Sequence, residues 1–344
     1  MRAPRVSIVA GSRNDEHGGN PRRRTELFIH TLAAFAKRTQ APLELILVEW
    51  NTPADRGPLA EALTWPDDPG PLVIRVITVP PAVHARVQNA DRVPFFQMIA
   101  KNVGIRRAEG TFVLATNIDL LLNEPLVWCL GHGPLDPDCV YRIDRLDLVL
   151  RDLPDGLDVD EQLALASLAI GRVAEPRGTI EYDRAVLRQR YGHAAAPFSG
   201  FAPDEIARLL AGAERRKPHF EACGDFTMMA REEWERLRGY PELPLYSMHQ
   251  DSIGLKMALV SGLRQVVFPE PMRCYHIEHG MGWGVAEDRS RLMSTFPMLS
   301  DADLARWFAK LEAAGTALTP NGPDWGFGDE TFAEWRLQPK RAAA

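Results

Sequence analysis

The hydrophobic positions of the first 120 residues fall into two alternating patterns. Short continuous apolar runs predict buried strands, at residues 6–10, 43–48, 73–79 and 111–116. After the first of these runs, apolar residues recur at helical spacing, and Asn20 followed by Pro21 is typical of the start of a helix. A further helix is expected to begin at Pro94. Because strands that alternate with helices indicate a mostly parallel sheet with right-handed crossovers, the sequence predicts an α/β fold.

Two polar side chains follow directly after the strand expected at 111–116. The preceding segment ends a helix at Gly110, because glycine tolerates the left-handed conformation that is common at helix C-termini. Asn117 and Asp119 come after the strand, and open α/β sheets bind ligands beyond the carboxyl ends of their strands. Two oxygen-bearing side chains on the same side suit a hard divalent cation and the phosphates it carries. The alternative is a turn in which both side chains cap backbone groups.

The middle of the chain is less regular. Prolines divide residues 130–220 into short pieces, with helices expected at 160–170 and 203–216. Arg145 follows an expected strand and either faces a cleft or forms a structural pair with a neighbouring aspartate. We interpret this region as a helical insertion that contributes either acceptor recognition or partner contact.

Regular patterns return after residue 222. A turn leading into a buried strand, a short helix ended by Gly239, a second helix and a further strand are expected, at residues 223–229, 231–238, 248–262 and 264–268. Asp251 lies in the first turn of the second helix, where a carboxylate complements the helix dipole. For a single carboxylate at this position, complementing the dipole is the more common explanation.

The segment from Cys274 to Gly284 holds an unusual cluster of polar residues. If its strand extends to Glu278, then His276 and Glu278 share one face and His279 points away. Neutral imidazole is a common metal ligand, so the cluster is a candidate metal site, although single histidines are more often structural. The following loop carries glycines around Trp283 and is either a lid over a site or a surface turn.

Composition and motifs narrow the class of protein. A formal net charge of −6 argues against a nucleic-acid partner, and four scattered cysteines indicate reduced thiols rather than disulfides. The sequence holds neither an apolar signal core nor a run long enough to span a membrane, so we expect a soluble cytoplasmic protein. It also lacks the glycine motifs of dinucleotide-binding enzymes and of P-loop nucleotide hydrolases. The oligomeric state stays open.

Three segments together resemble the GT-A glycosyltransferases, in particular their family-2-like members. The first is similar to the pattern (R/K)N-x-G…A-x-G…D-x-D and comprises Ala100-Lys101-Asn102-Val103-Gly104-Ile105, Ala108-Glu109-Gly110 and Asn117-Ile118-Asp119. The second resembles the acceptor-side half and runs from Gly224 to Glu242, followed by Gln250-Asp251. The third is His276, where many GT-A enzymes place a metal-binding histidine. The resemblance covers residues 5–120 and 220–285, and the order of the three segments is more specific than any one of them.

The resemblance implies an inverting, metal-dependent transfer of a sugar from a nucleotide sugar, by default a UDP sugar, to a hydroxyl of a carbohydrate acceptor. The enzyme would act in the biosynthesis of cell-surface polysaccharide. Residues 1–130 would form the nucleotide-sugar-binding half of a GT-A domain, 131–220 the insertion, and 221–344 the acceptor-binding and catalytic half with a C-terminal helix.

The resemblance also implies roles for individual residues. Asp119 would bind Mn²⁺ or Mg²⁺ with His276 or, less directly, His279. Asp251 would remove the proton from the acceptor hydroxyl, and Asp225 would contact the donor sugar or the acceptor. The expected contacts to the nucleotide sugar are Ala10, Gly11, Ser12, Arg13, Glu49, Lys101, Asn102, Asn117, Ile118 and Trp283.

One position departs from the family pattern, because Asn117 replaces the first acidic residue of D-x-D. This neutral side chain leaves open a weak metal site or a metal-independent variant. It is also the best argument for an alternative, a non-catalytic protein that binds nucleotide sugars or carbohydrates. Two further alternatives are a sugar-nucleotide nucleotidyltransferase and a metal-dependent hydrolase built on His276, Glu278 and His279.

Overall fold

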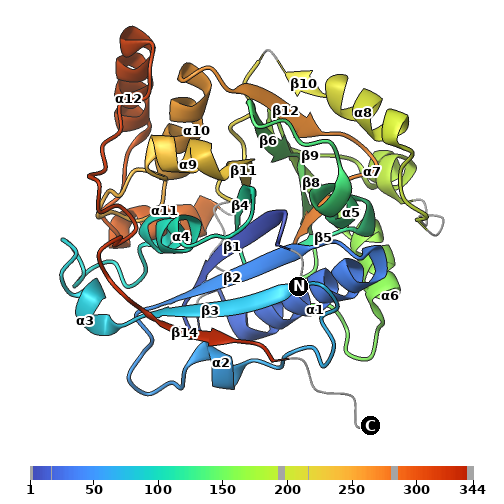
Figure 1. The fold of residues 1–344 in the computed structure, drawn as a ribbon, viewed down its shortest axis with the longest axis horizontal. Coiled ribbons are helices and arrows are strands. Elements are labelled where there is room, and N and C mark those ends of the chain that lie inside the picture. The colour runs from blue at the N-terminus through green and yellow to red at the C-terminus, as the bar shows by residue number, and fades with distance from the viewer. Residues whose placement is uncertain (1–2, 17, 193–197, 216, 280–285, 339–344) are drawn as a thin grey trace.

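The computed structural model describes residues 3–16, 18–192, 198–215, 217–279 and 286–338. In this part of the chain a large sheet has nine strands, β1 (Val6–Ser12), β2 (Leu43–Trp50), β3 (Val73–Val79), β4 (Phe112–Thr116), β6 (Cys139–Ile143), β10 (Glu214–Arg215), β11 (Phe226–Ala230), β12 (Arg264–Phe268) and β14 (Ala333–Arg336). Their order across the sheet is β10-β12-β6-β11-β4-β1-β2-β3-β14 (Figure 1). Only β10, β11 and β14 run against the direction of the others, so the predicted α/β class with a mainly parallel sheet is confirmed.

A smaller sheet lies beside the large one. Its order is β5-β13-β7-β8-β9, and its strands are β5 (Leu120–Leu122), β13 (Cys274–His276), β7 (Arg145–Leu148), β8 (Ile170–Glu175) and β9 (Gly178–Glu181). This sheet differs from two expectations that were based on the sequence. The middle region is not a purely helical insertion, because it supplies β6 to the large sheet and β7 to β9 to the small one. The strand expected to reach Glu278 ends at His276.

Helices cover both faces of the large sheet. One hydrophobic core lies between the sheet and helices that include α1 (Pro21–Thr39) and α5 (Glu124–His132). The other core holds α4 (Gln97–Arg106), α9 (Arg231–Leu237), α10 (Gln250–Val260) and α12 (Asp301–Ala314). The remaining helices are α2 (Leu59–Ala62), α3 (Pro81–His84), α6 (Val159–Leu168), α7 (Arg184–Tyr191), α8 (Pro203–Ala211) and α11 (Ala286–Thr295).

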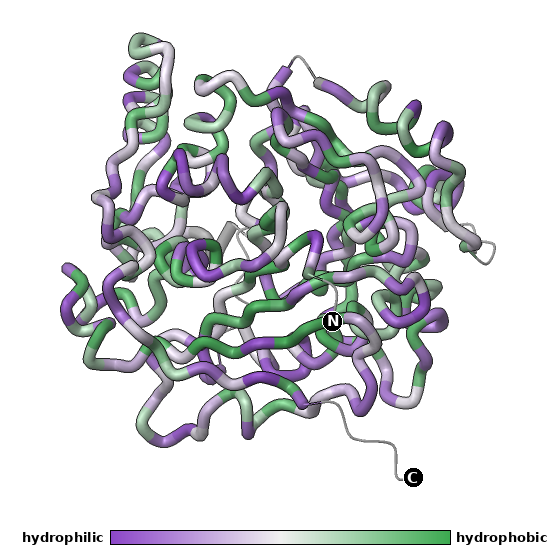
Figure 2. The backbone as a smooth tube through the Cα atoms, viewed as in Figure 1, coloured by the Kyte–Doolittle hydropathy of each residue, from purple (hydrophilic) through white to green (hydrophobic). Residues whose placement is uncertain are grey.

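The central strands read as continuous apolar runs because both of their faces are buried. In β2, Leu45 and Leu47 pack into the first core, whereas Ile46 and Val48 pack into the second. Successive side chains of a strand point to opposite faces, so each core receives every second residue. Figure 2 shows the resulting hydrophobic centre and the more hydrophilic outer elements. No described helix has both the length and the apolar character needed to cross a membrane.

Two polar details of the central sheet have structural explanations. Arg75 interrupts the apolar run of β3 because its guanidinium binds Glu44 (Nη1 to Oε1, 2.7 Å) and Glu334 of β14 (Nη2 to Oε2, 2.8 Å). Gly110 does not adopt the left-handed conformation expected of it. A Cβ at this position would lie 2.6 Å from the backbone nitrogen of Ser7, so glycine is needed for close approach to β1.

Candidate active site

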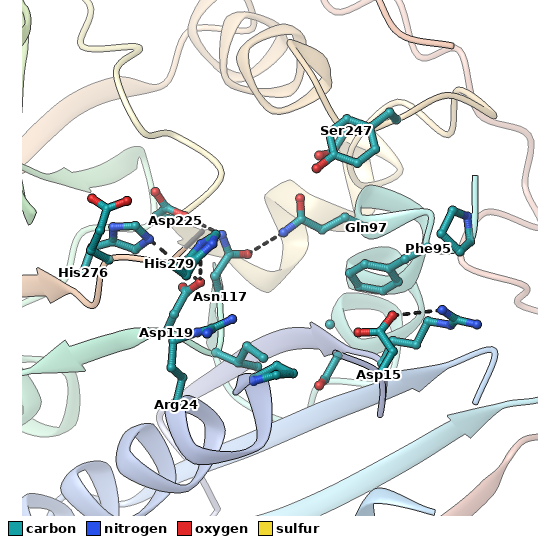
Figure 3. A pocket seen from close by; sticks show the side chains of 18 of the residues that line it. Asp15, Arg24, Phe95, Gln97, Asn117, Asp119, Asp225, Ser247, His276 and His279 are labelled. Carbon is teal, nitrogen blue, oxygen red and sulfur yellow. Dashed lines mark hydrogen bonds and ion pairs between the residues drawn. The ribbon is translucent and has the colours of Figure 1, made fainter. Parts of the chain in front are cut away.

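A pocket of about 240 Å³ opens at the carboxyl ends of β1 and β4. Gly11, Ser12 and Arg13 line it where β1 ends, and Asn117, Ile118 and Asp119 line it just after β4. These six residues were predicted as donor or metal contacts, and the parallel pairing of β1 with β4 brings both strand ends to the same edge. Figure 3 shows Asp119 and the histidines at one end of the pocket and Phe95 with Asp15 at the other.

Asp119, His276 and His279 form a compact cluster at the first end. Each offers one potential ligand atom, and the three atoms lie within 4.8 Å of one another. Asp119 Oδ2 is 3.2 Å from His279 Nε2 and 3.9 Å from His276 Nε2. His279 does not point away as expected, because the regular strand ends at His276 and the following residues turn back toward the pocket.

The small sheet fixes the backbone of this cluster. Strand β5 begins directly after Asp119 and pairs with β13, so that Leu120 lies opposite His276. The amide of Ile277 then donates to the carbonyl oxygen of Asp119 (2.9 Å). Two segments that are distant in the sequence are therefore held side by side at the cluster.

The electrostatics of the cluster fit a bound cation. Burial raises the pKa of the Asp119 carboxyl, but the hydrogen bond from His279 and the charges of both histidines and Arg24 outweigh burial and hold that pKa far below its usual range. Asp119 Oδ1 is buried and accepts no hydrogen bond from the described residues. One carboxylate oxygen and two imidazole nitrogens are a ligand set that a divalent transition metal accepts.

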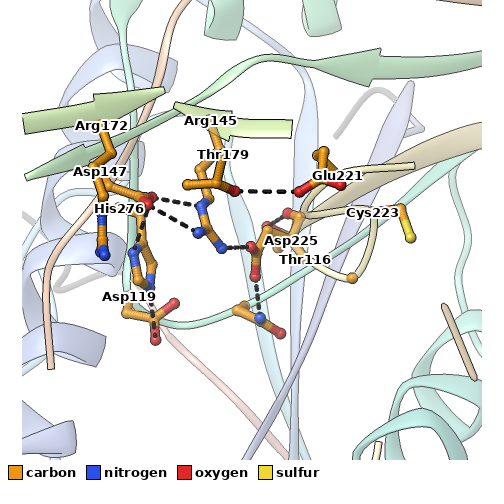
Figure 4. Close-up of polar contacts among 12 residues, drawn as sticks. Thr116, Asp119, Arg145, Asp147, Arg172, Thr179, Glu221, Cys223, Asp225 and His276 are labelled. Atoms are coloured by element: carbon orange, nitrogen blue, oxygen red, sulfur yellow. Dashed lines mark hydrogen bonds and ion pairs between the residues drawn. The ribbon is translucent and has the colours of Figure 1, made fainter. Parts of the chain in front are cut away.

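A buried carboxylate lies behind His276. Asp147 of β7 is 1% exposed, and its Oδ1 is 3.4 Å from His276 Nδ1. Burial and the charge of Arg145 lower the pKa of His276, but the contact with Asp147 and the charges of Asp119 and Asp147 outweigh them, so that this pKa is raised. Asp147 is itself held by Arg145 (Nε to Oδ1, 2.7 Å) and lies 3.5 Å from Arg172 Nε (Figure 4). A carboxylate behind a metal-binding histidine orients the ring and raises its basicity.

Asp225 is fixed in the pocket wall by three neighbours. Arg145 Nη1 binds its Oδ2, and Asn117 Nδ2 donates to its Oδ1. Thr116 Oγ1 donates to its carbonyl oxygen (2.7 Å). Asn117 also accepts a hydrogen bond from Gln97 Nε2 at its Oδ1 (2.8 Å), so this amide is engaged at both ends.

Four expected donor contacts lie behind the pocket instead of lining it. Ala10 is buried in the strand, and the Glu49 carboxylate accepts hydrogen bonds from the Leu59 amide and the Thr52 hydroxyl. Asn102 Nδ2 donates to Tyr240 O (2.8 Å), and Lys101 Nζ donates to Gly224 O (2.7 Å). The polar groups of Glu49, Asn102 and Lys101 bind carbonyls, an amide and a hydroxyl of neighbouring segments, and none of the four residues is part of the pocket lining.

Lys101 is fully buried. Burial lowers the pKa of its ammonium group to about 8, although the charges of Asp225 and Asp251 oppose this shift. The lysine holds the turn that presents Asp225. It is not among the residues that line the pocket, although the sequence resemblance implied that it contacts the nucleotide sugar.

Asp251 lies in the first turn of α10, as expected, but it does not line the pocket. Its Oδ1 accepts a hydrogen bond from the Ser252 amide (2.8 Å), and its Oδ2 would be 2.8 Å from a Cβ at Gly224. Tyr246 and Ser247, which precede α10, do line the pocket. The proposed lid and Trp283 lie outside the described residues.

The pocket also contains residues that the sequence did not indicate. Arg24, Arg172, Phe95 and the parallel-stacked rings of Tyr246 and Phe296 line it, with the two stacked centroids 4.9 Å apart. At the same end as Phe95, Arg13 Nη1 pairs with Asp15 Oδ2 (2.9 Å). Arg24 lies in the first turn of α1, shortly after Asn20 and Pro21. The predicted start of this helix was therefore the sequence feature that could have indicated Arg24 as a site residue.

The chain matches no protein-family model and no curated protein. Among solved structures, S. aureus TarS 1–349 is 14% identical over 90% of this chain and 70% of its own, with a TM-score of 0.42. GalNAc-T7 with UDP, GalNAc and Mn²⁺ is 13% identical over 95% of this chain and 54% of its own, with a TM-score of 0.44. The catalytic domain of Drosophila beta1,4galactosyltransferase 7 in complex with xylobiose is 12% identical over 85% of this chain and 80% of its own, with a TM-score of 0.36.

These three solved structures are glycosyltransferases, the class that the sequence segments of this chain resemble. Their identities and TM-scores are low, so what this pocket binds has to be inferred from its own residues.

Proposed function

We propose that this chain is a glycosyltransferase that transfers a sugar from a nucleoside-diphosphate sugar to a hydroxyl of a carbohydrate acceptor. The observation that carries the proposal is the cluster of Asp119, His276 and His279 in a pocket at the carboxyl ends of parallel strands. A cation at such a place would hold a diphosphate next to the groups that bind the rest of the donor. The order of the sequence segments supports the same assignment.

The metal is Mn²⁺ rather than Mg²⁺ in this proposal. Mg²⁺ prefers oxygen ligands, whereas two of the three candidate ligands here are imidazoles. Asp119, His276 and His279 would hold the ion, with Asp147 orienting His276. When bound, the ion supplies Lewis-acid stabilisation of the charge that develops on the leaving diphosphate.

The rest of the donor would occupy the pocket toward Arg13 and Phe95. The Phe95 ring lies against Gly11, where a Cβ would come within 2.9 Å of its Cζ atom, so glycine is required beside this aromatic wall. A flat apolar ring next to the charged pair of Arg13 and Asp15 suits a nucleobase, which stacks and forms hydrogen bonds at its edge. A uracil base is the default that follows from the sequence resemblance.

In the proposed transfer, the acceptor oxygen bonds to the anomeric carbon as the bond from that carbon to the diphosphate breaks. The proton of the acceptor hydroxyl passes to Asp251, which lies beside Gly224 next to the donor pocket rather than in its lining, and the nucleoside diphosphate leaves. Asp251 rather than Asp225 is assigned as base, because both carboxylate oxygens of Asp225 are engaged by Arg145 and Asn117. A base separate from the donor site favours inversion at the anomeric carbon.

The test is thermal stabilisation by a panel of nucleoside diphosphates, each measured with Mn²⁺, with Mg²⁺ and without metal. A ligand at 100 times its dissociation constant should add about 2.7 kcal/mol to the free energy of unfolding. We expect stabilisation by one nucleotide that increases with Mn²⁺ and disappears in Asp119→Asn. Asp144→Asn is the matched control, because this carboxylate lies near His219, outside the pocket. Stabilisation by none of the nucleotides would contradict the proposal.

A non-catalytic nucleotide-sugar-binding protein is the second candidate. Asn117 favours it, because this neutral residue occupies the first position of the acidic motif and its side chain is engaged by Gln97 and Asp225. Release of nucleoside diphosphate from the stabilising nucleotide sugar, with and without carbohydrate acceptors, separates the two candidates. Binding without release across the acceptor panel would favour the second.

A further inference from the structure

Arg24 is a buried cation in the pocket wall beside the candidate metal ligands. It lies in the first turn of α1, is 3% exposed and lines the pocket. Its Nη1 donates to the carbonyl oxygens of Gly18 and Gly19, which anchors the guanidinium in place. Figure 3 shows the guanidinium group next to the Asp119 carboxylate.

The remaining charged groups of the pocket wall are arranged in pairs. Four arginines and four carboxylates of the described residues line the pocket. Three arginines are each paired with a carboxylate of the same wall, in the pairs Arg13–Asp15, Arg145–Asp225 and Arg172–Glu278. Arg24 is the fourth. Burial lowers its pKa, and the charges of Asp119 in the pocket wall and of Asp152 outside it oppose this effect.

The charged groups behind the wall do not change this balance. The buried Asp147 and the partly buried Asp251 contribute two negative charges, and the fully buried Lys101 and Arg142 contribute two positive ones. These four charges cancel, and the two histidines carry no charge when they bind a metal. A divalent cation held by Asp119 would leave the wall with an excess of about two positive charges, from the ion and Arg24 together.

We infer that Arg24 binds the diphosphate of the donor together with the metal. This inference rests on the proposed function and deepens it by naming a second anchor for the anionic part of the substrate. The diphosphate of a nucleotide sugar carries two negative charges, which matches the excess. A guanidinium also donates hydrogen bonds to phosphate oxygens in a planar geometry that suits them. The pocket would thus select diphosphate-linked donors over nucleosides and over neutral sugars.

The same arrangement predicts opposite effects of Arg24 on the two ligands. Its positive charge lies beside the cluster and repels a cation that binds alone. Once a diphosphate is present, the positive charge of Arg24 attracts this anion, which the metal and Arg24 bind together. A purely structural role, in which Arg24 only fastens the turn at Gly18 and Gly19, would produce neither effect.

The test compares Arg24→Gln, Arg24→Lys and wild type by calorimetric titration with Mn²⁺ alone and with uridine, UMP and UDP at saturating Mn²⁺. The corresponding guanosine ligands are used if the nucleotide panel selects that base. Glutamine removes the charge but keeps a donor for the Gly19 carbonyl, and lysine keeps the charge. Arg23→Gln is the matched control, because Arg23 lies on the same helix turn and pairs with Asp155 outside the pocket (2.8 Å).

We expect Arg24→Gln to weaken UDP binding by about 10-fold or more, the effect of losing a hydrogen bond to a charged group. Its affinity for uridine should stay within about threefold of wild type, and Mn²⁺ alone should bind at least as tightly as before. Arg24→Lys should recover most of the loss, and Arg23→Gln should behave as wild type.

Equal UDP affinity in Arg24→Gln and wild type would overturn the inference and leave the proposed function standing. Equal losses for uridine and UDP would also overturn it, because they would indicate a distorted pocket. If wild type binds no nucleoside diphosphate with Mn²⁺, the proposed function fails and the inference fails with it. If Arg24→Gln does not fold, Arg24→Lys still tests the inference, since loss of UDP binding with uridine binding intact would contradict a role based on charge.

Discussion

Asn117 donates a hydrogen bond from its Nδ2 to Oδ1 of Asp225, and at its other end it accepts one from Gln97. This relationship gives a physical reason for the departure from D-x-D. An aspartate at position 117 could not donate to Asp225 and would place a second carboxylate against it. The amide therefore belongs to the wall that holds Asp225, and the candidate cation ligands lie elsewhere.

Restoring the acidic motif should harm the protein. We expect Asn117→Asp to lower the free energy of unfolding by about 1–3 kcal/mol, because a partly buried hydrogen bond is replaced by like-charge repulsion. Mn²⁺ affinity should not rise. Thermal unfolding and Mn²⁺ titration measure the two quantities. Asn117→Ala is the control, since it loses the hydrogen bonds without adding charge and should unfold between wild type and Asn117→Asp. Tighter Mn²⁺ binding by Asn117→Asp would contradict this interpretation.

Asp147 should tune the metal site without touching the metal. We expect Asp147→Asn to weaken Mn²⁺ binding by about 10- to 100-fold, the usual effect of removing a carboxylate behind a ligating histidine. Glu175→Gln removes another buried carboxylate of the same sheet, one that pairs with Arg177, and should leave Mn²⁺ affinity unchanged. A lower unfolding temperature with unaltered Mn²⁺ affinity would limit Asp147 to a structural role.

Lys101 should make stability depend on pH in the alkaline range. Its pKa is about 8 in the folded protein and about 10.4 in the unfolded chain, so between these values the unfolded state binds the additional proton. The cost of burying the ammonium is complete below the folded pKa and is relieved as the pH rises toward the unfolded one. The stability of wild type relative to Lys101→Met should therefore increase between pH ~8 and ~10. Denaturant unfolding at a series of pH values measures this difference, and a constant or falling difference would contradict the prediction.

Asp251 should affect turnover more than donor binding. We expect Asp251→Asn to lower kcat by about 10²- to 10⁴-fold, the range that general-base catalysis contributes. The affinity for nucleoside diphosphate and Mn²⁺ should be retained, because Asp251 does not line the pocket. Steady-state kinetics and nucleotide titration separate the two effects. Unchanged turnover would remove Asp251 from the role of base.

The sequence predicts the strands of the central sheet well, because burial on both faces leaves continuous apolar runs with sharp ends. The expected ranges 73–79 and 264–268 agree with β3 and β12 to the residue. Because the end of β4 was predictable, Asp119, which comes three residues after Thr116, could be placed at the edge of the sheet. The positions of polar residues next to such strands are therefore the most predictable part of the site.

The rest of the site depends on contacts that local patterns do not encode. Arg145 and Arg172 reach the pocket, and Asp147 lies behind His276, only because β7 pairs with β13 and with β8. Pairing between distant segments cannot be derived from either segment alone. For a related reason, the sequence did not reveal that Lys101 and Glu49 lie outside the pocket lining. A buried polar side chain and a ligand-binding one have the same appearance in a sequence, and only the carbonyls and amides around them decide between the two.

The pairing of β5 with β13 brings Asp119, His276 and His279 together from the two halves of the chain. Contacts over so long a sequence separation are entropically costly to form, so the cluster depends on an intact small sheet. An ion held there would have little affinity for partly folded chains. It would therefore stabilise the folded state by linking the two halves of the chain. The metal concentration would then determine both the turnover of the enzyme and the rate at which the folded protein unfolds.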